Sequence, residues 1–213
     1  MFSLRLTAFL AIPLCVILFV FNVPVIHILF ERGKFDTGST ALTAYALRYA
    51  SIGAAFYAIN YVILRAYYST KKVTFLLVAY GAALVVNLGL GLILRDRWAI
   101  GGITFARSIS ELTLFIALLL YLKSFLVEFQ PLRHIGYVVG LCLMAIGAAA
   151  GGFLVFEFLP YYSGIYGFIL RFVVSSSSVL LFYALIGLLT RNKEISAFVV
   201  ILKSRFWNRN VVV

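Results

Sequence analysis

Six long apolar runs constrain this chain more than any other feature of its sequence. Each run holds more than 20 residues, which lets a helix cross about 30 Å of hydrocarbon. Transmembrane strands would instead alternate polar and apolar residues over about ten positions, and these runs are apolar on every face. The sequence therefore predicts an all-α integral membrane protein with six transmembrane helices in residues 1–194, at about 6–30, 41–64, 73–94, 100–122, 135–159 and 165–190.

The composition agrees with a membrane protein. Of the 213 residues, 64% are hydrophobic and 12% are charged, whereas an ordinary soluble domain carries about 25% charged residues. The segment 195–213 is apolar at first but too short to cross a bilayer. We expect a cytoplasmic tail there, either as an interfacial helix held by Lys203, Arg205 and Trp207 or as frayed chain.

Positive charge is distributed unevenly between the two ends of the predicted helices. Of the 18 Lys and Arg residues, eleven fall on the side that holds both termini, four on the other side and three inside spans. Because cytoplasmic loops are enriched in Lys and Arg, we expect both termini in the cytoplasm. The basic residues sit between apolar runs and form no stripe, so the net charge of +11 does not predict nucleic-acid binding.

The titratable residues form no enzyme signature. His27 and His134 are far apart in the sequence, and Cys15 and Cys142 fall inside apolar runs. The sequence holds no nucleophile with a nearby base, no paired carboxylates in one span and no metal-ligand spacing. It therefore predicts a protein that is not an enzyme and that holds no metal and no cofactor.

Charged side chains inside the spans are informative because each must find water or a partner in hydrocarbon. Arg48 lies near the middle of the second span, among several tyrosines. Its surroundings fit either the wall of a polar cavity or a hydrogen bond between helices. Arg107 and Glu111 are four residues apart, so they share a helix face, and we expect a structural ion pair.

Two prolines, Pro13 and Pro24, interrupt the first span. Proline removes a backbone donor and bends a helix. Broken membrane helices occur where they line a cavity, and simple kinks are also common. Both interpretations stay open for this span.

A charged segment from Glu31 to Asp36 follows the first span. It places Arg32 and Lys34 on the side where positive charge is otherwise scarce. Arginine can hold a phosphate through two parallel hydrogen bonds. Since Glu31 and Asp36 flank the cations, the sequence predicts either an anion site or an ion-paired loop.

Small residues in the fifth span form a GxxxG pattern at Gly147 and Gly151. Such a pattern lets two membrane helices approach closely. We expect it to serve helix packing, with no particular partner indicated.

Residues 29–110 resemble the MurJ/MviN family of lipid II flippases. In that family a span with two prolines leads into LFxRGxF, matched here by Leu29, Phe30, Arg32, Gly33 and Phe35. Further family elements match in order at Thr43, Ala44, Ala46, Leu47 and Gly53, at Leu64, Arg65, Ala66, Tyr67 and Tyr68, at Asn87, and at residues 102–110. The sequence departs from the family at Arg107, where a small polar residue is usual, and at residues 69–74.

The resemblance implies one six-helix lobe of the multidrug/oligosaccharidyl-lipid/polysaccharide (MOP) exporter type. It implies translocation of lipid II, the lipid-linked peptidoglycan precursor, across the bacterial cytoplasmic (inner) membrane by alternating access. Arg32 would contact the pyrophosphate or headgroup, and Lys34 and Arg48 join it as substrate-binding candidates because of their charge and place. The residues expected to act as structural motifs are Pro13, Pro24, Gly33, Arg65, Tyr68 and Asn87.

The matched motifs belong to the second lobe of the family, so a first lobe is absent from this chain. The expected partners are lipid II, membrane lipids, and either a separate first lobe or a second copy of this chain. Two alternatives remain: a lobe that exports another polyprenyl-linked oligosaccharide, or a remnant or scaffold half that transports nothing.

Overall fold

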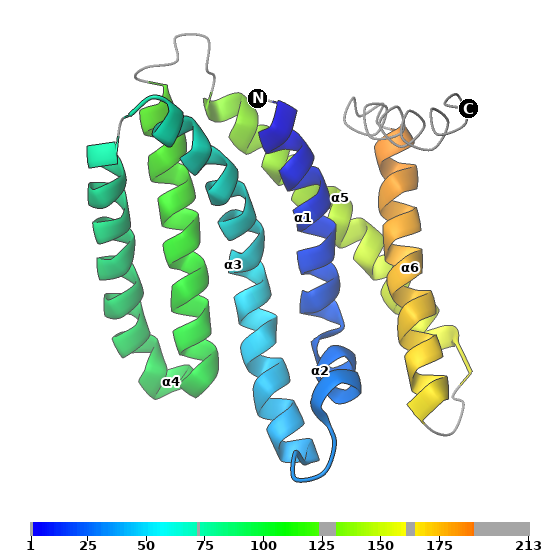
Figure 1. Ribbon diagram of the computed structural model, residues 1–213. Coiled ribbons are helices and arrows are strands. Elements are labelled where there is room, and N and C mark those ends of the chain that lie inside the picture. Colours follow the sequence, from blue (N-terminus) through cyan, green and yellow to red (C-terminus); the bar gives the residue numbers. More distant parts are fainter. Residues whose placement is uncertain (1, 72, 124–130, 161–164, 190–213) are drawn as a thin grey trace, which may run out of the picture.

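The chain folds into long helices that run back and forth along one direction (Figure 1). The computed structural model describes residues 2–71, 73–123, 131–160 and 165–189, so the predicted tail at 195–213 lies outside the described part. The helices are α1 (Phe2–Val20), α2 (Asn22–Phe30), α3 (Thr37–Ser69), α4 (Val73–Leu122), α5 (Pro131–Phe158) and α6 (Ile165–Leu189). Five of them are long and apolar enough to cross a membrane, as predicted for an all-α membrane protein.

The longest helix, α4, contains two crossings because the chain reverses within it. Ala99 has non-helical dihedral angles (φ 46°, ψ −127°), and the limbs on either side of it run antiparallel (Figure 1). A side chain at Gly102 would meet the Leu94 carbonyl, and one at Gly101 would meet the Tyr45 ring. Glycine at position 102 therefore permits the tight reversal, and glycine at position 101 permits the close approach to α3. The first limb continues to the residue before Ala99, past the end expected at residue 94, so almost no loop separates the limbs.

The first predicted span is divided into α1 and α2. The break falls at Phe21 (φ −101°, ψ 32°), three residues before Pro24. Proline cannot donate to the carbonyl four residues earlier and its ring crowds that carbonyl. The Asn22 side-chain amide donates to the Phe19 carbonyl at 2.6 Å and satisfies one acceptor at the break. Pro13, by contrast, stays inside α1 and is buried.

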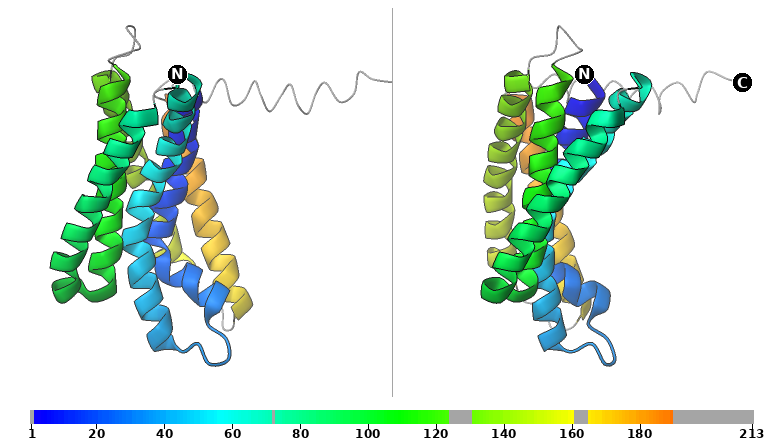
Figure 2. Two further views of the ribbon diagram at one scale, coloured as in Figure 1. Left: turned by 60° about the vertical axis from the view of Figure 1, so that its left-hand side comes forward. Right: turned by 90° about the vertical axis from the view of Figure 1, so that its left-hand side faces the viewer.

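Helix α3 lies at the centre of the packing, between α1 and the two limbs of α4 (Figure 2). The Ser108 hydroxyl accepts from the Gly53 amide at 3.0 Å and donates to the Tyr49 carbonyl at 2.7 Å. A Cβ at Gly53 would lie only 2.7 Å from the Ser108 Cα, so this close approach requires glycine. Further along, the Tyr67 hydroxyl donates to the Leu118 carbonyl at 2.6 Å.

Helices α5 and α6 pack on each other through small residues. A side chain at Gly152 would meet Val179, and one at Gly151 would come within 2.9 Å of the Phe182 ring, whereas Gly147 has open space around it. The close contact therefore uses Gly151 and Gly152 rather than the Gly147–Gly151 pair that the sequence suggested. Arg171 of α6 donates to the Phe156 carbonyl near the end of α5 at 2.6 Å.

The connections alternate between the two ends of the bundle. The start of α1, the α3–α4 turn and the end of α6 lie at one end, and the α2–α3 loop and the α4 reversal lie at the other (Figure 1). This alternation is the arrangement on which the charge count depended. Arg32, Lys34, Arg95 and Arg97 share the end that holds the α2–α3 loop and the α4 reversal.

Candidate functional site

The two cations of the α2–α3 loop are exposed to solvent, whereas its two acids form hydrogen bonds with other residues of the chain. Arg32 and Lys34 are exposed, and the Arg32 guanidinium donates to the Ile28 carbonyl at 3.3 Å. Glu31 Oε2 lies 2.8 Å from His27 Nδ1 and accepts from the Thr40 hydroxyl at 2.6 Å. Asp36 caps α3 by accepting from the Ser39 amide at 2.8 Å. Among the described residues, neither acid forms an ion pair with Arg32 or Lys34.

These contacts determine the charge of the loop. The Thr40 hydroxyl, followed by the His27 ring, lowers the pKa of Glu31 below its usual value of 4.5. The Ser39 amide and hydroxyl lower the pKa of Asp36. Both acids are therefore ionised near neutral pH while their hydrogen bonds are already used. The cations remain available to an external anion, and Gly33, with φ of +62°, forms the turn between them.

The third predicted binding residue, Arg48, lies on another part of the molecule. It is an exposed residue of α3, and its guanidinium carbon lies 5.0 Å from the centroid of the Phe19 ring of α1. A cation over an aromatic face is an attractive contact. Arg48 lies within α3, whereas Arg32 and Lys34 lie in the loop before it. The structure therefore has two separate sites of positive charge.

The expected motif residues of α3 and α4 do not lie together in the structure. Arg65 and Tyr68 are exposed near the end of α3, and the Arg65 guanidinium lies 5.2 Å from the Tyr61 ring. Asn87 lines a cleft between α3 and the two limbs of α4. Within the described ranges, no group of three or more metal-ligating side chains is present.

Phe19, beneath Arg48, belongs to the wall of an apolar cavity between α1, α3 and α5. The cavity has a volume of about 510 Å³. Cys15 and Cys142 both line it, and so do Ile59 and Phe153. Arg48 therefore stands at the rim of a space that suits hydrocarbon.

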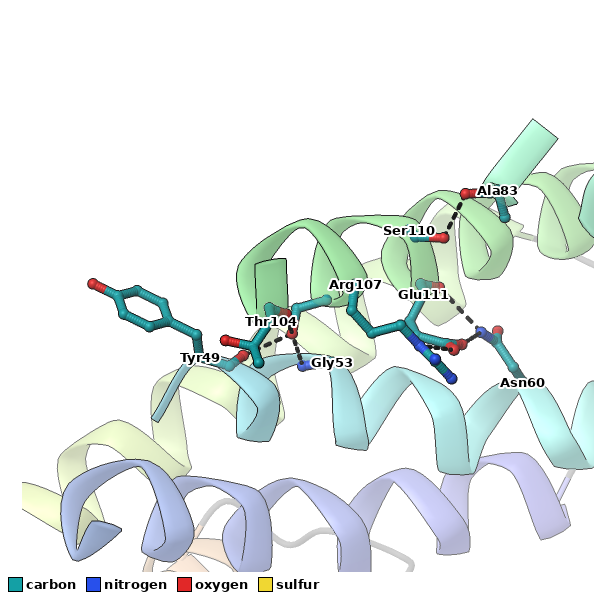
Figure 3. Close-up of polar contacts among 9 residues, drawn as sticks. Tyr49, Gly53, Asn60, Ala83, Thr104, Arg107, Ser110 and Glu111 are labelled. Carbon is teal, nitrogen blue, oxygen red and sulfur yellow. Dashed lines mark hydrogen bonds and ion pairs between the residues drawn. The ribbon is translucent and has the colours of Figure 1, made fainter. Parts of the chain in front are cut away.

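The cleft on the opposite side of α3, called the polar cleft below, has polar and charged side chains among its walls. It has a volume of about 490 Å³, and its walls are Ala50, Gly53, Ala54, Tyr57, Asn87, Ile103, Thr104, Arg107, Ser108 and Glu111. Figure 3 shows Glu111 of α4 joined by dashed lines to Arg107 of the same helix and to Asn60 of α3. Arg107 Nε lies 3.4 Å from Glu111 Oε1, and the Asn60 amide donates to the Glu111 carbonyl at 3.0 Å and to Oε2 at 3.2 Å.

Sequence reasoning identified the pair but not the cleft. The spacing of Arg107 and Glu111 predicted their contact, and the structure confirms it. It did not predict that Asn60, 51 residues before Glu111, holds the carboxylate. An amide within an apolar span was the available signal, because such a group must find a partner in hydrocarbon.

Comparison with known proteins identifies the family. The family model described as "Lipid II flippase MurJ" matches residues 1–190. The chain belongs to the MurJ family. It is therefore a multi-pass membrane protein of a transporter family, in agreement with the helices long enough to cross a membrane.

Individual MurJ proteins match this chain over only a part of their own length. The Bdellovibrio bacteriovorus protein named "Probable lipid II flippase MurJ" is 28% identical over 123 residues, which cover 58% of this chain and 24% of that protein. A Rhizobium meliloti protein of the same name is 26% identical over 108 residues, which cover 51% of this chain and 20% of that protein.

The fold also matches a solved MurJ structure. A lipid II flippase MurJ in an inward closed conformation superposes with a TM-score of 0.69 and 22% identity, over 87% of this chain and 38% of that one. This likeness shows that the two chains share an all-α membrane fold. The chain spans well under half the length of the MurJ proteins that it matches.

Proposed function

We propose that this chain forms one lobe of a lipid II flippase, which moves lipid-linked peptidoglycan precursor across the bacterial cytoplasmic membrane by alternating access. The observation that carries the proposal is the family match over residues 1–190. The fold gives independent support, because the helices alternate between two ends as a transport lobe requires. The work is transport without covalent chemistry, so the chain is not an enzyme.

Three cations are the proposed contacts to the substrate headgroup. Arg32 and Lys34 are exposed on a loop whose acids are engaged by His27, Thr40 and Ser39, so their charge is available to a pyrophosphate. Arg48 stands at the rim of the apolar cavity, where a headgroup and a hydrocarbon tail could be held together. Arginine suits this role because its fork binds two phosphate oxygens at once.

The orientation follows from charge. We place both termini in the cytoplasm, because eleven Lys and Arg residues lie on their side and four on the other. The loop with Arg32 and Lys34 then faces the outer side of the membrane. A substrate released there would meet these two cations at the end of its crossing.

The partner is proposed from the matched length. The chain spans 38% of the solved MurJ structure, and exposed Arg48 and Arg107 within its spans need a covering surface or water. A separate first-lobe chain or a second copy of this chain would enclose them, with membrane lipids around the rest. The remaining alternatives are an exporter lobe for another polyprenyl-linked oligosaccharide and a half that transports nothing.

Complementation tests the proposal. The chain is expressed in cells depleted of their own lipid II flippase, alone and together with a matched first lobe, and membrane levels are measured in both. We expect growth to be rescued with the first lobe present, and Arg32→Ala to abolish rescue while membrane levels stay normal. Rescue by the chain alone would favour a homodimer. Absence of rescue with normal insertion would contradict lipid II transport.

A further inference from the structure

The α3–α4 cleft contains an ion pair whose two members are held very differently. The Arg107 side chain is 64% exposed, whereas that of Glu111 is 13% exposed. Their contact is a single long one of 3.4 Å through Nε, not the two-bond fork that arginine forms with a carboxylate at best. Arg107 therefore has unused donors inside a membrane-spanning segment.

Glu111 is the fixed partner. Asn60, which is buried in α3, donates to both the backbone carbonyl and Oε2 of Glu111 (Figure 3). Two hydrogen bonds from one buried amide restrain the carboxylate at the wall of the cleft. The guanidinium has no comparable restraint, so it is the member that can move.

The cleft has room and further donors for a ligand. Its volume of about 490 Å³ is in the usual range for small-molecule sites, roughly 300–1,000 Å³. Asn87 of the first α4 limb and Tyr57 of α3 line it beside Arg107. The hydroxyls of Thr104 and Ser108 already donate to backbone carbonyls. Arginine offers donors only, so the ligand that fits it is an anion with several acceptor oxygens.

We propose that the α3–α4 cleft binds a phosphate-type anion through Arg107, and that Glu111 competes with this anion for the guanidinium. A diphosphate diester and a phospholipid headgroup share this chemistry. That the natural anion is the diphosphate of a polyprenyl-linked substrate rests on the proposed function; the binding itself does not.

When the anion takes Arg107, the Asn60 amide still holds Glu111 at the wall of the cleft. Binding of the anion therefore exchanges one partner of the guanidinium for another, and Glu111 stays in place as the competitor.

Calorimetry on the full chain tests the inference. The chain is reconstituted in phosphatidylcholine nanodiscs and titrated at neutral pH with symmetrical dimethyl diphosphate. Arg107→Ala is expected to weaken binding at least about tenfold, as for loss of a charged hydrogen bond.

Two variants separate the site from general charge and folding effects. Glu111→Gln is expected to bind the diphosphate more tightly than the unmodified chain, because it removes the competing carboxylate. Arg95→Ala removes the same charge as Arg107→Ala from an exposed position outside the cleft and is expected to bind as the unmodified chain does. Should Arg107→Ala fail to fold, the tighter binding expected of Glu111→Gln still decides the question.

The source of the anion is distinguished by a second arm with phosphatidylglycerol nanodiscs. Weaker diphosphate binding there would assign the cleft to lipid headgroups, and equal binding would assign it to the diphosphate. Unchanged affinity in either Arg107→Ala or Glu111→Gln would overturn the inference. If the chain binds diphosphate but does not complement, the anion site stands and the proposed flippase function is wrong. If the chain complements but binds no diphosphate, the flippase function stands and the anion site is wrong.

Discussion

The two faces of α3 border spaces of nearly equal size but different polarity. The cavity toward α1 and α5 measures about 510 Å³ and the cleft toward α4 about 490 Å³. Ser51, Ala55 and Ile59 face the first, whereas Gly53 and Tyr57 face the second. The polar cleft is held by side-chain hydrogen bonds across 51 to 59 residues of sequence, whereas the apolar cavity is lined mainly by hydrophobic side chains. One helix can thus serve a hydrocarbon chain and a charged group on opposite sides.

The largest expected effect is at the closest approach of α3 to α4. Gly53→Val would place a side chain against the Ser108 backbone, where a Cβ already lies 2.7 Å from Cα. Overpacking of this kind destabilises by about 3 kcal/mol, and we expect thermal unfolding in detergent at a lower temperature. The polar cleft would be distorted while the apolar cavity stays intact.

Gly147→Val provides the matched control, since nothing lies within 4 Å of a Cβ at that position. Equal loss of stability in the two variants would show that helix propensity, and not the contact with Ser108, limits substitution at Gly53.

A smaller effect on stability is expected from substituting Asn60 and Ile59, two neighbouring residues on the two sides of α3. Asn60→Leu removes both hydrogen bonds to Glu111 and leaves Oε2 of this half-buried carboxylate without its amide donor, which costs about 2 kcal/mol. Ile59→Leu, on the apolar side, conserves volume and should cost less than about 1.5 kcal/mol. Thermal unfolding compares the two. A greater loss in Ile59→Leu would mean that the polar network contributes less than packing.

The smallest effect is expected at the α2–α3 loop, which lies outside both spaces. The fold lowers the pKa of Glu31 below 4.5 through Thr40 and His27. Its ionised form therefore stabilises the fold above that pH, and this contribution is lost as the pH falls through the lowered value. In Glu31→Gln the stability measured by thermal unfolding should change less with acidification. Glu157→Gln, at an exposed acid of α5, should retain the normal pH dependence.

Much of the fold could be predicted from the apolar runs, because a helix must satisfy its own backbone in hydrocarbon and a run of more than 20 apolar residues leaves no other choice. The break near Pro24 was also predictable from the missing donor. That Pro13 causes no such break was not, since both prolines carry the same local signal. The reversal at Ala99 was obscured because Arg95, Asp96 and Arg97 suggest a loop where the helix continues.

The candidate site was predictable only in part. Arg32, Lys34 and Arg48 were identifiable as charges in unusual places, and their role in binding stays a prediction. The sequence left open whether Glu31 and Asp36 neutralise Arg32 and Lys34; the structure directs these acids to His27, Thr40 and Ser39 instead. Asn60 and Glu111 meet across 51 residues, and no local pattern specifies a contact at that distance.

The reversal at Ala99 also affects how this chain can be made and mapped. The two limbs of α4 are joined with almost no connecting segment, and the Ser110 hydroxyl bonds to the Ala83 carbonyl across them at 2.6 Å. Such a hairpin enters a bilayer as one unit, because neither limb can be retained while the other is translocated. A reporter domain inserted between the limbs would separate them, so topology on that side is better read from single cysteines placed at Arg95 or Arg97.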